Sequence, residues 1–392
     1  MGKRMGKLDK ASNRRGLIMS IIIGADIVPT EGNSSYFEKE NTEYLVGNDL
    51  IQIFKDTDYR VFNLETPLTD DDTPIDKWGP ALRADCTTIA GFKKLGVDLF
   101  TLANNHIMDQ GETGLTSTID LLKKNEIFYL GAGENLEQAR KPFVKKIKGK
   151  RIGFYACAEH EFSIAREKNA GANPFDALES FDHVVALKAE CDFVVVLYHG
   201  GKEYYQYPSP LLQKVCRKFV EKGADLVVCQ HSHCIGCEEK YANGTIVYGQ
   251  GNFIFDDSND PLEEHSLLIK IEDDFSIDYL PLVKIANGVR LATGKDSKKI
   301  IDAFKNRSAQ IKEEGFVEKE YAKLASFMLQ NYLLICSGFR HRKICRILNR
   351  LTHGWVIRKL TSAYSKDELL ALRNFIECEA HRELWIKGLL RK

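Results

Sequence analysis

Short runs of β-branched and aromatic residues alternate along this chain with longer segments in which apolar residues recur at helical spacing. The helical spacing is clear in Gly114–Asn125 and Ser209–Lys222. Strands that alternate with helices predict a layered α/β protein, and an unbroken apolar run such as Phe193–Leu197 is typical of a strand buried on both faces. The expected strands are Leu17–Ile23, Tyr59–Asn63, Leu99–Leu102, Ile152–Ala156, Phe193–Tyr198, Leu226–Gln230 and Thr245–Tyr248.

The pattern changes near Asn287, after which the chain reads as helical and basic with no strand signal. Lysine plus arginine and aspartate plus glutamate both total 55, but Lys295–Lys392 holds 21 basic and 11 acidic residues, so the remainder carries a net charge of −10. We therefore predict a basic N-terminal segment (1–16), an α/β domain (17–290) and a basic helical region (291–392).

One stretch of the basic region has the pattern of an amphipathic helix. Apolar residues recur at helical spacing with basic residues between them. A basic amphipathic helix either lies on an anionic membrane surface or packs on the α/β domain with its basic face in solvent, and we favour the packed helix. Nucleic acid is not an expected partner, because no known binding motif accompanies the charge. The apolar residues are Ile344, Ile347, Leu348, Leu351 and Trp355, and the basic ones are Arg342, Lys343, Arg346 and Arg350.

Cysteine usage favours a reducing compartment. The ten cysteines are scattered, and the one close pair, Cys234 and Cys237, lacks the second pair of a structural zinc site. We interpret most of them as reduced core residues of a cytoplasmic protein. The first apolar run, Leu17–Ile23, is too short to span a membrane or to form a signal peptide, and a peripheral membrane location is the alternative.

Polar motifs follow the predicted strands, where α/β proteins collect ligand groups. Together they offer carboxylates, carboxamides and four histidines, which suit a divalent cation such as Mn²⁺, Fe²⁺, Zn²⁺ or Mg²⁺. Side chains two residues apart point to opposite faces of a strand, so His231 and His233 converge only at a turn. The motifs are Gly24–Asp26, Asn63–Glu65, Asn104–His106, His199–Gly201, His231–His233 and Gly251–Phe253.

The order of these motifs resembles the CapA family, which is named for proteins of bacterial capsule and poly-γ-glutamate synthesis. The resemblance covers about residues 18–285. It rests on Asn63-Leu-Glu-Thr-Pro67, on Leu102-Ala-Asn-Asn-His106 with Asp109, Gly111, Gly114 and Leu115, on His199-Gly-Gly-Lys-Glu-Tyr204 and on Gln230-His-Ser-His233. The family looks like a branch of the calcineurin-like metallophosphoesterases, which implies a four-layer α/β/β/α sandwich followed here by the helical C-terminal extension.

The same resemblance implies roles for individual residues in a site with one or two divalent ions. Asp26 and His233 would hold the first ion, and Glu65 would bridge to the second. His106 would act as general acid or stabilise the transition state. Ligands of the second ion would be Asn105, His199 and His231.

Two positions depart from the superfamily pattern. Val28 stands where a histidine is usual two residues after the first aspartate, and Glu65 is one methylene longer than the usual bridging aspartate. The first metal position is therefore expected to have fewer protein ligands than is usual in the superfamily.

Four further residues are weaker candidates for contact with an anionic substrate or polymer. Lys77 and Lys202 carry positive charge near the motifs, but for each of them we favour the alternative of a solvated surface charge. Asn252 either orients a ligand or caps a turn. Asn104 belongs to the Ala-Asn-Asn-His motif.

Three functions remain open at this point. The first is a metal-dependent, phosphoesterase-like hydrolase linked to capsule or poly-γ-glutamate synthesis. The second is a non-catalytic accessory or scaffold protein of a polymer synthesis complex, docked through its basic helices. The third is a metal-dependent amidase or peptidase that acts on a γ-glutamyl polymer. The same activated water would serve the first and the third.

Overall fold

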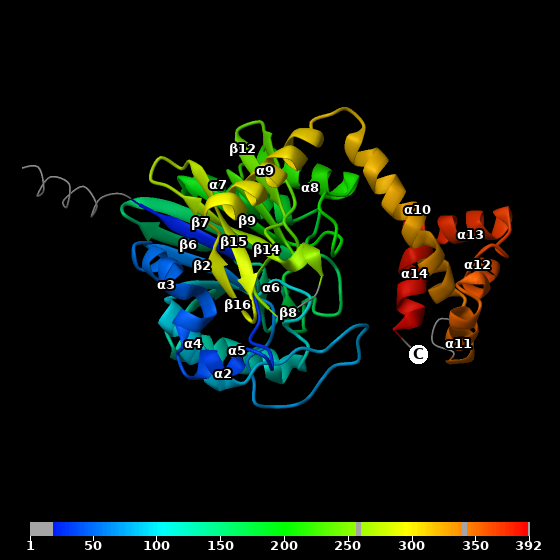
Figure 1. Cartoon of the computed structure of the whole chain (residues 1–392), viewed down its shortest axis with the longest axis horizontal. Coiled ribbons are helices and arrows are strands. Elements are labelled where there is room, and N and C mark those ends of the chain that lie inside the picture. The colour runs from blue at the N-terminus through cyan, green and yellow to red at the C-terminus, as the bar shows by residue number, and fades with distance from the viewer. Residues whose placement is uncertain (1–18, 256–259, 339–342, 391–392) are drawn as a thin grey trace, which may run out of the picture. The chain divides into compact units, whose positions relative to one another are not determined.

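The computed structural model describes residues 19–255, 260–338 and 343–390 of the chain. These residues form two compact units, one ending at Val317 and the other beginning at Glu318 (Figure 1). The basic segment 1–16 and the first two residues of the predicted strand Leu17–Ile23 lie outside the described residues.

The first sheet is mixed. Its strands follow the order β16-β15-β14-β1-β2-β3-β4, with β13 paired to β1. β1 to β4 are parallel, whereas β14 to β16 add antiparallel strands beside β1. The strands are β1 (Ile21–Ile27), β2 (Tyr59–Leu64), β3 (Leu99–Thr101), β4 (Phe128–Leu130), β13 (Asn252–Ile254), β14 (His265–Ile271), β15 (Ile277–Ile285) and β16 (Gly288–Leu291).

The second sheet is also mixed and has six strands in the order β11-β12-β10-β9-β7-β6. Its four central strands are parallel, and the two edge strands are antiparallel to their neighbours. They are β6 (Phe143–Ile147), β7 (Lys150–Ala158), β9 (Phe193–His199), β10 (Leu226–Gln230), β11 (Glu238–Tyr241) and β12 (Gly244–Tyr248). A separate pair joins β5 (Ala132–Gly133) to β8 (Gly171–Ala172).

Three buried apolar clusters separate four layers of structure. Phe54 and Phe92 of the outer helices pack on Phe62 of the first sheet. Residues such as Val61 and Val195 fill the space between the sheets. A third cluster lies between the second sheet and helices α7 and α8, so the predicted four-layer sandwich is confirmed. The helices of this unit are α2 (Ser34–Glu38), α3 (Thr42–Lys55), α4 (Ile89–Leu95), α5 (Gly111–Lys124), α6 (Leu136–Ala139), α7 (Ser180–Glu190), α8 (Pro210–Glu221) and α9 (Gly294–Gln310), with 3₁₀ turns at Cys86–Thr88 and Pro261–Glu263.

The first strand runs further than the sequence predicted. β1 continues through Gly24 to Ile27, with a register shift between Ile23 and Asp26. Gly24 allows this course because a Cβ there would lie 2.1 Å from Cε1 of Phe62. The Gly24–Asp26 motif therefore belongs to the strand itself, and it places Asp26 at the carboxyl end of the sheet.

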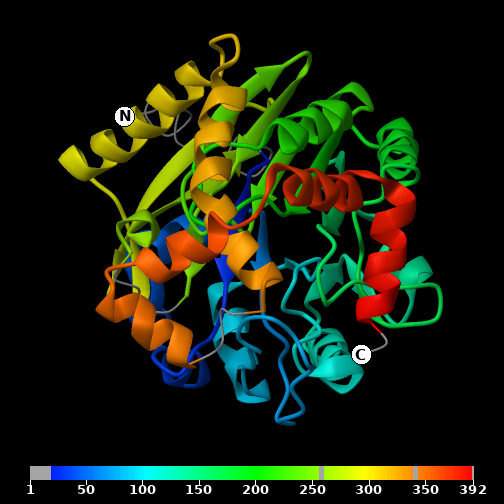
Figure 2. The same cartoon turned by 90° about the vertical axis from the view of Figure 1, so that its right-hand side faces the viewer.

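The second unit is helical, as predicted for the C-terminal region (Figures 1 and 2, orange to red). The first unit extends to Val317, past α9, because α9 packs on β11 and β15. The predicted domain boundary at 290 stays a prediction. Over the three described ranges, no helix has the length and apolar content to cross a membrane. The unit contains α10 (Phe316–Cys336), α11 (Lys343–Leu351), α12 (Trp355–Thr361), α13 (Lys366–Glu377) and α14 (Glu379–Leu389).

Candidate metal centre

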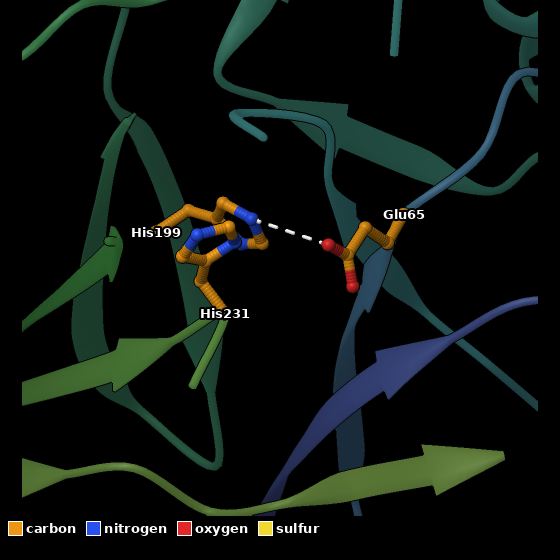
Figure 3. A group of neighbouring side chains, drawn as sticks. All are labelled: Glu65, His199 and His231. Carbon is orange, nitrogen blue, oxygen red and sulfur yellow. Dashed lines mark ion pairs between the residues drawn. The ribbon is translucent and has the colours of Figure 1, made fainter. Parts of the chain in front are cut away.

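The carboxyl ends of strands from both sheets meet at one place. Asp26 lies at the end of β1, and Glu65 directly follows β2. His199 ends β9 and His231 directly follows β10 in the other sheet. Figure 3 shows Glu65 facing the two imidazole rings across the space between the sheets. Parallel strands thus deliver residues far apart in sequence to one site.

Ligand atoms gather in three overlapping groups, each with its atoms within 4.8 Å of one another. One group is Glu65 with His199 and His231, and another is Asp26 with Glu65 and His233. Glu65 belongs to both groups. The third group joins His231 and His233 to Glu203. The six residues predicted as ligands on the resemblance therefore lie in one cluster, with Asn105 joined to it through His199.

Two buried polar groups at the centre are consistent with a bound cation. Within the described part of the chain, Oε2 of Glu65 and Nδ1 of His231 are buried and have no hydrogen-bond partner. Oε1 of Glu65 is also buried without a hydrogen bond and lies 3.4 Å from Nε2 of His199 as an ion pair. Leaving buried polar atoms unpaired costs free energy. Carboxylate oxygen and imidazole nitrogen are ligands of divalent metals, so this donor set fits the ion.

Asparagine side chains hold the carboxylate and imidazole groups in place. Nδ2 of Asn63 donates to Oδ1 of Asp26 at 2.8 Å and lies 3.3 Å from Nδ1 of His199. Asn104 donates to Oδ1 of Asn63 and to the Leu64 carbonyl, and its own carbonyl accepts the backbone N–H of His106. Asn104 is fully buried, so these bonds give it a positioning role; contact with a substrate stays a prediction.

His231 and His233 converge because the backbone leaves the strand conformation at both. Their φ angles are 91° and 56°, in the left-handed region that residues other than glycine rarely adopt. The ring centroids lie 5.8 Å apart. Nδ1 of His233 donates to Oδ1 of Asn252 at 2.8 Å. Nε2 of the neutral ring then carries the lone pair that could bind a metal ion. Asn252 therefore orients a ring of the candidate centre.

Asn105 and His106 are joined to this cluster on the side of the first sheet. Oδ1 of Asn105 lies 3.0 Å from Nε2 of His199. Nδ1 of His106 lies 2.5 Å from Oδ2 of Asp109, whose other oxygen pairs with Nζ of Lys77 at 2.6 Å. The Lys77 side chain is only 3% exposed, so the alternative of a solvated surface charge is wrong for this residue; substrate contact by Lys77 stays a prediction.

Burial and mutual charge set the protonation of the cluster. Burial, together with Glu65, raises the pKa of Asp26 to about 6. Burial opposes ionisation of Glu65 as well, but the charge and hydrogen bonding of His199 together with the charges of the neighbouring histidines outweigh it and hold the pKa of Glu65 below its usual range. Burial and the charge of His199 lower the pKa of His231 well below its usual value. A neutral His231 retains the lone pair that a metal requires.

Lys202 lies at the border of the site. Its Nζ is 3.6 Å from Glu203, and both side chains are more than a third exposed. Among the residues that the sequence did not assign, Glu203 joins the third ligand group and Asp109 contacts His106. Both stand inside the quoted motifs, so the motif positions carried the signal that could have identified them.

Position 28 offers no ligand to this cluster. Val28 is 1% exposed, and its backbone N–H donates to the carbonyl of Ile254 at 2.8 Å. The apolar side chain is packed in the protein. Within the described residues, the ligand group that contains Asp26 is completed by Glu65 and His233.

The segment that contains this cluster is similar to bacterial capsule synthesis proteins. The family profile described as "Bacterial capsule synthesis protein PGA_cap" matches residues 20–257. The "Capsule biosynthesis protein CapA" of Bacillus anthracis is 32% identical over 212 residues, which are 52% of this chain and 51% of that protein. The "PGA biosynthesis protein CapA" of Bacillus subtilis strain 168 is 31% identical over 211 residues, 52% and 55% of the two chains. The chain thus spans about half the length of these curated relatives.

Among solved structures, a phosphatase from Mycoplasma pneumoniae covers 69% of this chain and 95% of its own at 11% identity and a TM-score of 0.44. The matched family segment includes the whole cluster from Asp26 to Asn252. The predicted resemblance to the CapA family is confirmed.

Proposed function

Because the chain belongs to the bacterial capsule synthesis protein family PGA_cap, we propose that it is a divalent-metal-dependent hydrolase of phosphoester type. Its proposed place is the synthesis of an anionic capsular polymer of the poly-γ-glutamate kind. The polymer context rests on the names of the relatives from the two Bacillus species. The reaction class rests on the chemistry of the cluster.

One observation carries the proposal. The Glu65 carboxylate is fully buried and faces His199 and His231. Within the described residues its Oε2 has no hydrogen-bond partner, and its Oε1 meets Nε2 of His199 as an ion pair at 3.4 Å. In the proposed site, one or two ions would be held by six residues: Asp26, Glu65, Asn105, His199, His231 and His233. A divalent ion there supplies a Lewis acid and lowers the pKa of water.

The residues around the ion have separate tasks. Asn63 orients the ring of His199 through Nδ1. Nε2 of the same ring faces Oδ1 of Asn105 and Oε1 of Glu65, the side on which the ring would bind the ion. Asp109 accepts a hydrogen bond from Nδ1 of His106, so protonated His106 presents Nε2–H to a leaving oxygen. General acid catalysis of this kind contributes about 10²- to 10⁴-fold.

The test combines metal content with turnover in the full chain. The purified protein is expected to contain at least about one divalent ion per chain by elemental analysis and to hydrolyse p-nitrophenyl phosphate or its bis-ester. His231→Ala should lose both properties, whereas the exposed control His381→Ala should keep them. Unchanged metal content and turnover in His231→Ala would reject the assignment.

Two other functions give different results in the same assay. Hydrolysis of a γ-glutamyl anilide without phosphoester hydrolysis would indicate an amidase acting on a γ-glutamyl polymer. Bound metal with no turnover on any substrate would indicate a non-catalytic accessory protein. The buried Val28 favours this second candidate, because it leaves the Asp26 side with few ligands.

A further inference from the structure

Helices α11 and α12 expose a row of large apolar side chains. Ile347, Leu348 and Leu351 of α11 are 59%, 44% and 71% exposed, and Trp355 at the start of α12 is 57% exposed. We call these four residues the apolar face. Single exposed apolar residues are ordinary, but neighbouring ones of this size mark an interaction surface.

The apolar face follows from the helical period. Residues 347, 348 and 351 lie within one turn and share one side of α11, since positions three and four apart are neighbours on a helix. Arg350 lies at the edge of that stripe, three residues after Ile347, and is exposed. Gly354, with φ of 84°, ends this segment and begins α12. Both helices are short, with nine residues in α11 and seven in α12. The apolar residues of α11 lie along one side of it.

The surrounding sequence carries charge of one sign. Between Glu320 and Asp367 there are nine lysines and arginines and no acidic residue. Such a segment selects an anionic partner. A second copy of the chain is disfavoured as the partner, because it would bring two positively charged surfaces together. A nucleic acid is disfavoured because it offers no apolar layer for Leu351 and Trp355. An anionic lipid surface provides negative charge and an apolar layer beneath it.

The lengths of the helices fit a position on such a surface. A transmembrane helix needs about 20 apolar residues, and no helix in the described ranges meets that requirement. A short amphipathic helix instead lies in the plane of the interface, with its apolar side at the boundary of the acyl chains. Tryptophan is enriched at that depth, which suits Trp355.

We propose that α11 and α12 dock this protein on an anionic membrane surface. The apolar face enters the lipid boundary, and the basic residues around it contact the headgroups. The inference does not depend on the proposed hydrolase, because the metal cluster contributes none of its residues.

The experiment is flotation of the full chain with lipid vesicles. We expect binding to vesicles of phosphatidylcholine with phosphatidylglycerol, release by high salt, and no binding to phosphatidylcholine alone. Arg350→Gln combined with Lys359→Gln should weaken partitioning by about 25-fold at low salt, since each basic residue near such a surface contributes about a factor of five. Leu351→Ser combined with Trp355→Ser should abolish flotation.

Controls separate this surface from general effects. Leu211→Ser removes an apolar side chain that is 70% exposed on α8 and should bind vesicles like the parent. Circular dichroism and metal content should be unchanged in all variants. Absence of flotation with anionic vesicles would overturn the proposal, and so would normal flotation of Leu351→Ser/Trp355→Ser. A parent dimer that this variant converts to a monomer, without vesicle binding by either, would assign the face to a second copy and also overturn it.

Discussion

Nζ of Lys77 lies 2.6 Å from Oδ1 of Asp109, with the side chains 3% and 0% exposed. The same carboxylate accepts the backbone N–H of Leu82 and faces Nδ1 of His106. This ion pair therefore ties the loop after Glu65 to the histidine that we propose as general acid.

Replacing Lys77 with methionine should destabilise the protein by about 3 kcal/mol, because it leaves a buried carboxylate without its cation. Urea unfolding measures the loss. Lys218→Met is the matched control, since Lys218 pairs with Glu221 at an exposed site and such pairs contribute about 0–1 kcal/mol. Equal destabilisation by the two substitutions would show that the burial of the Lys77 pair has no energetic consequence.

The sequence predicted the layers and the cluster because both follow from local patterns. Continuous apolar runs such as Phe193–Tyr198 are typical of buried strands, and polar residues after parallel strands collect at one edge of a sheet. Lys77 could not be placed this way. Its burial depends on Asp109, 32 residues later in the chain, and a lysine in a polar loop carries no local sign of that contact.

The same limit applies to the backbone at His231 and to the later strands. Nothing in the sequence around His231 signals a φ of 91°, because a residue with a Cβ reaches this conformation only when surrounding contacts impose it. β15 (Ile277–Ile285) was not predicted either. Its burial is uneven and it contains Pro281, so its pairing with β14 rather than an alternating pattern defines it as a strand.

Asn252→Ala should weaken metal binding while leaving the fold intact. Asn252 accepts from Nδ1 of His233 and donates to Glu263, so its removal frees the ring to rotate. Loss of such a supporting partner typically costs about 10- to 100-fold in metal affinity. Competition with a chelator dye measures the affinity. The control Asn48→Ala removes an exposed asparagine that is hydrogen-bonded to Glu43 and should leave the metal affinity unchanged. If Asn252→Ala bound metal as tightly as the parent, Asn252 would have a role in the turn only.

Divalent metal should stabilise the folded protein through Glu65. An ion that binds only the folded state adds about 2.7 kcal/mol at a concentration 100 times its dissociation constant. Thermal unfolding with Mn²⁺ or Zn²⁺ against excess EDTA should therefore show a higher midpoint with metal in the parent. Glu65→Gln keeps the shape of the side chain and removes its charge, so the midpoint should no longer respond. A response as large as that of the parent would exclude Glu65 as a ligand.

His183 should contribute a pH dependence of stability that is separate from the metal cluster. Burial, aided by the charge of Arg140, lowers the pKa of His183 below its ordinary 6.5, and its Nδ1 lies 3.3 Å from the hydroxyl of Tyr155. Just below pH 6.5 the unfolded chain therefore binds more protons at this residue than the folded protein does. The stability that it contributes is fully present above pH 6.5 and is lost progressively as the pH falls from that value through the lowered pKa of the folded protein.

His183→Gln keeps a polar group near Tyr155 and removes the titration. The free energy of unfolding, measured by urea at pH 7.5 and pH 5.5 in EDTA, should fall less between these values in the variant than in the parent. His381→Gln, at an exposed position of α14, should retain the pH dependence of the parent. Because every other histidine titrates alike in parent and variant, the difference between the two curves isolates His183. Identical curves would mean that the ring protonates equally in the folded and unfolded chain.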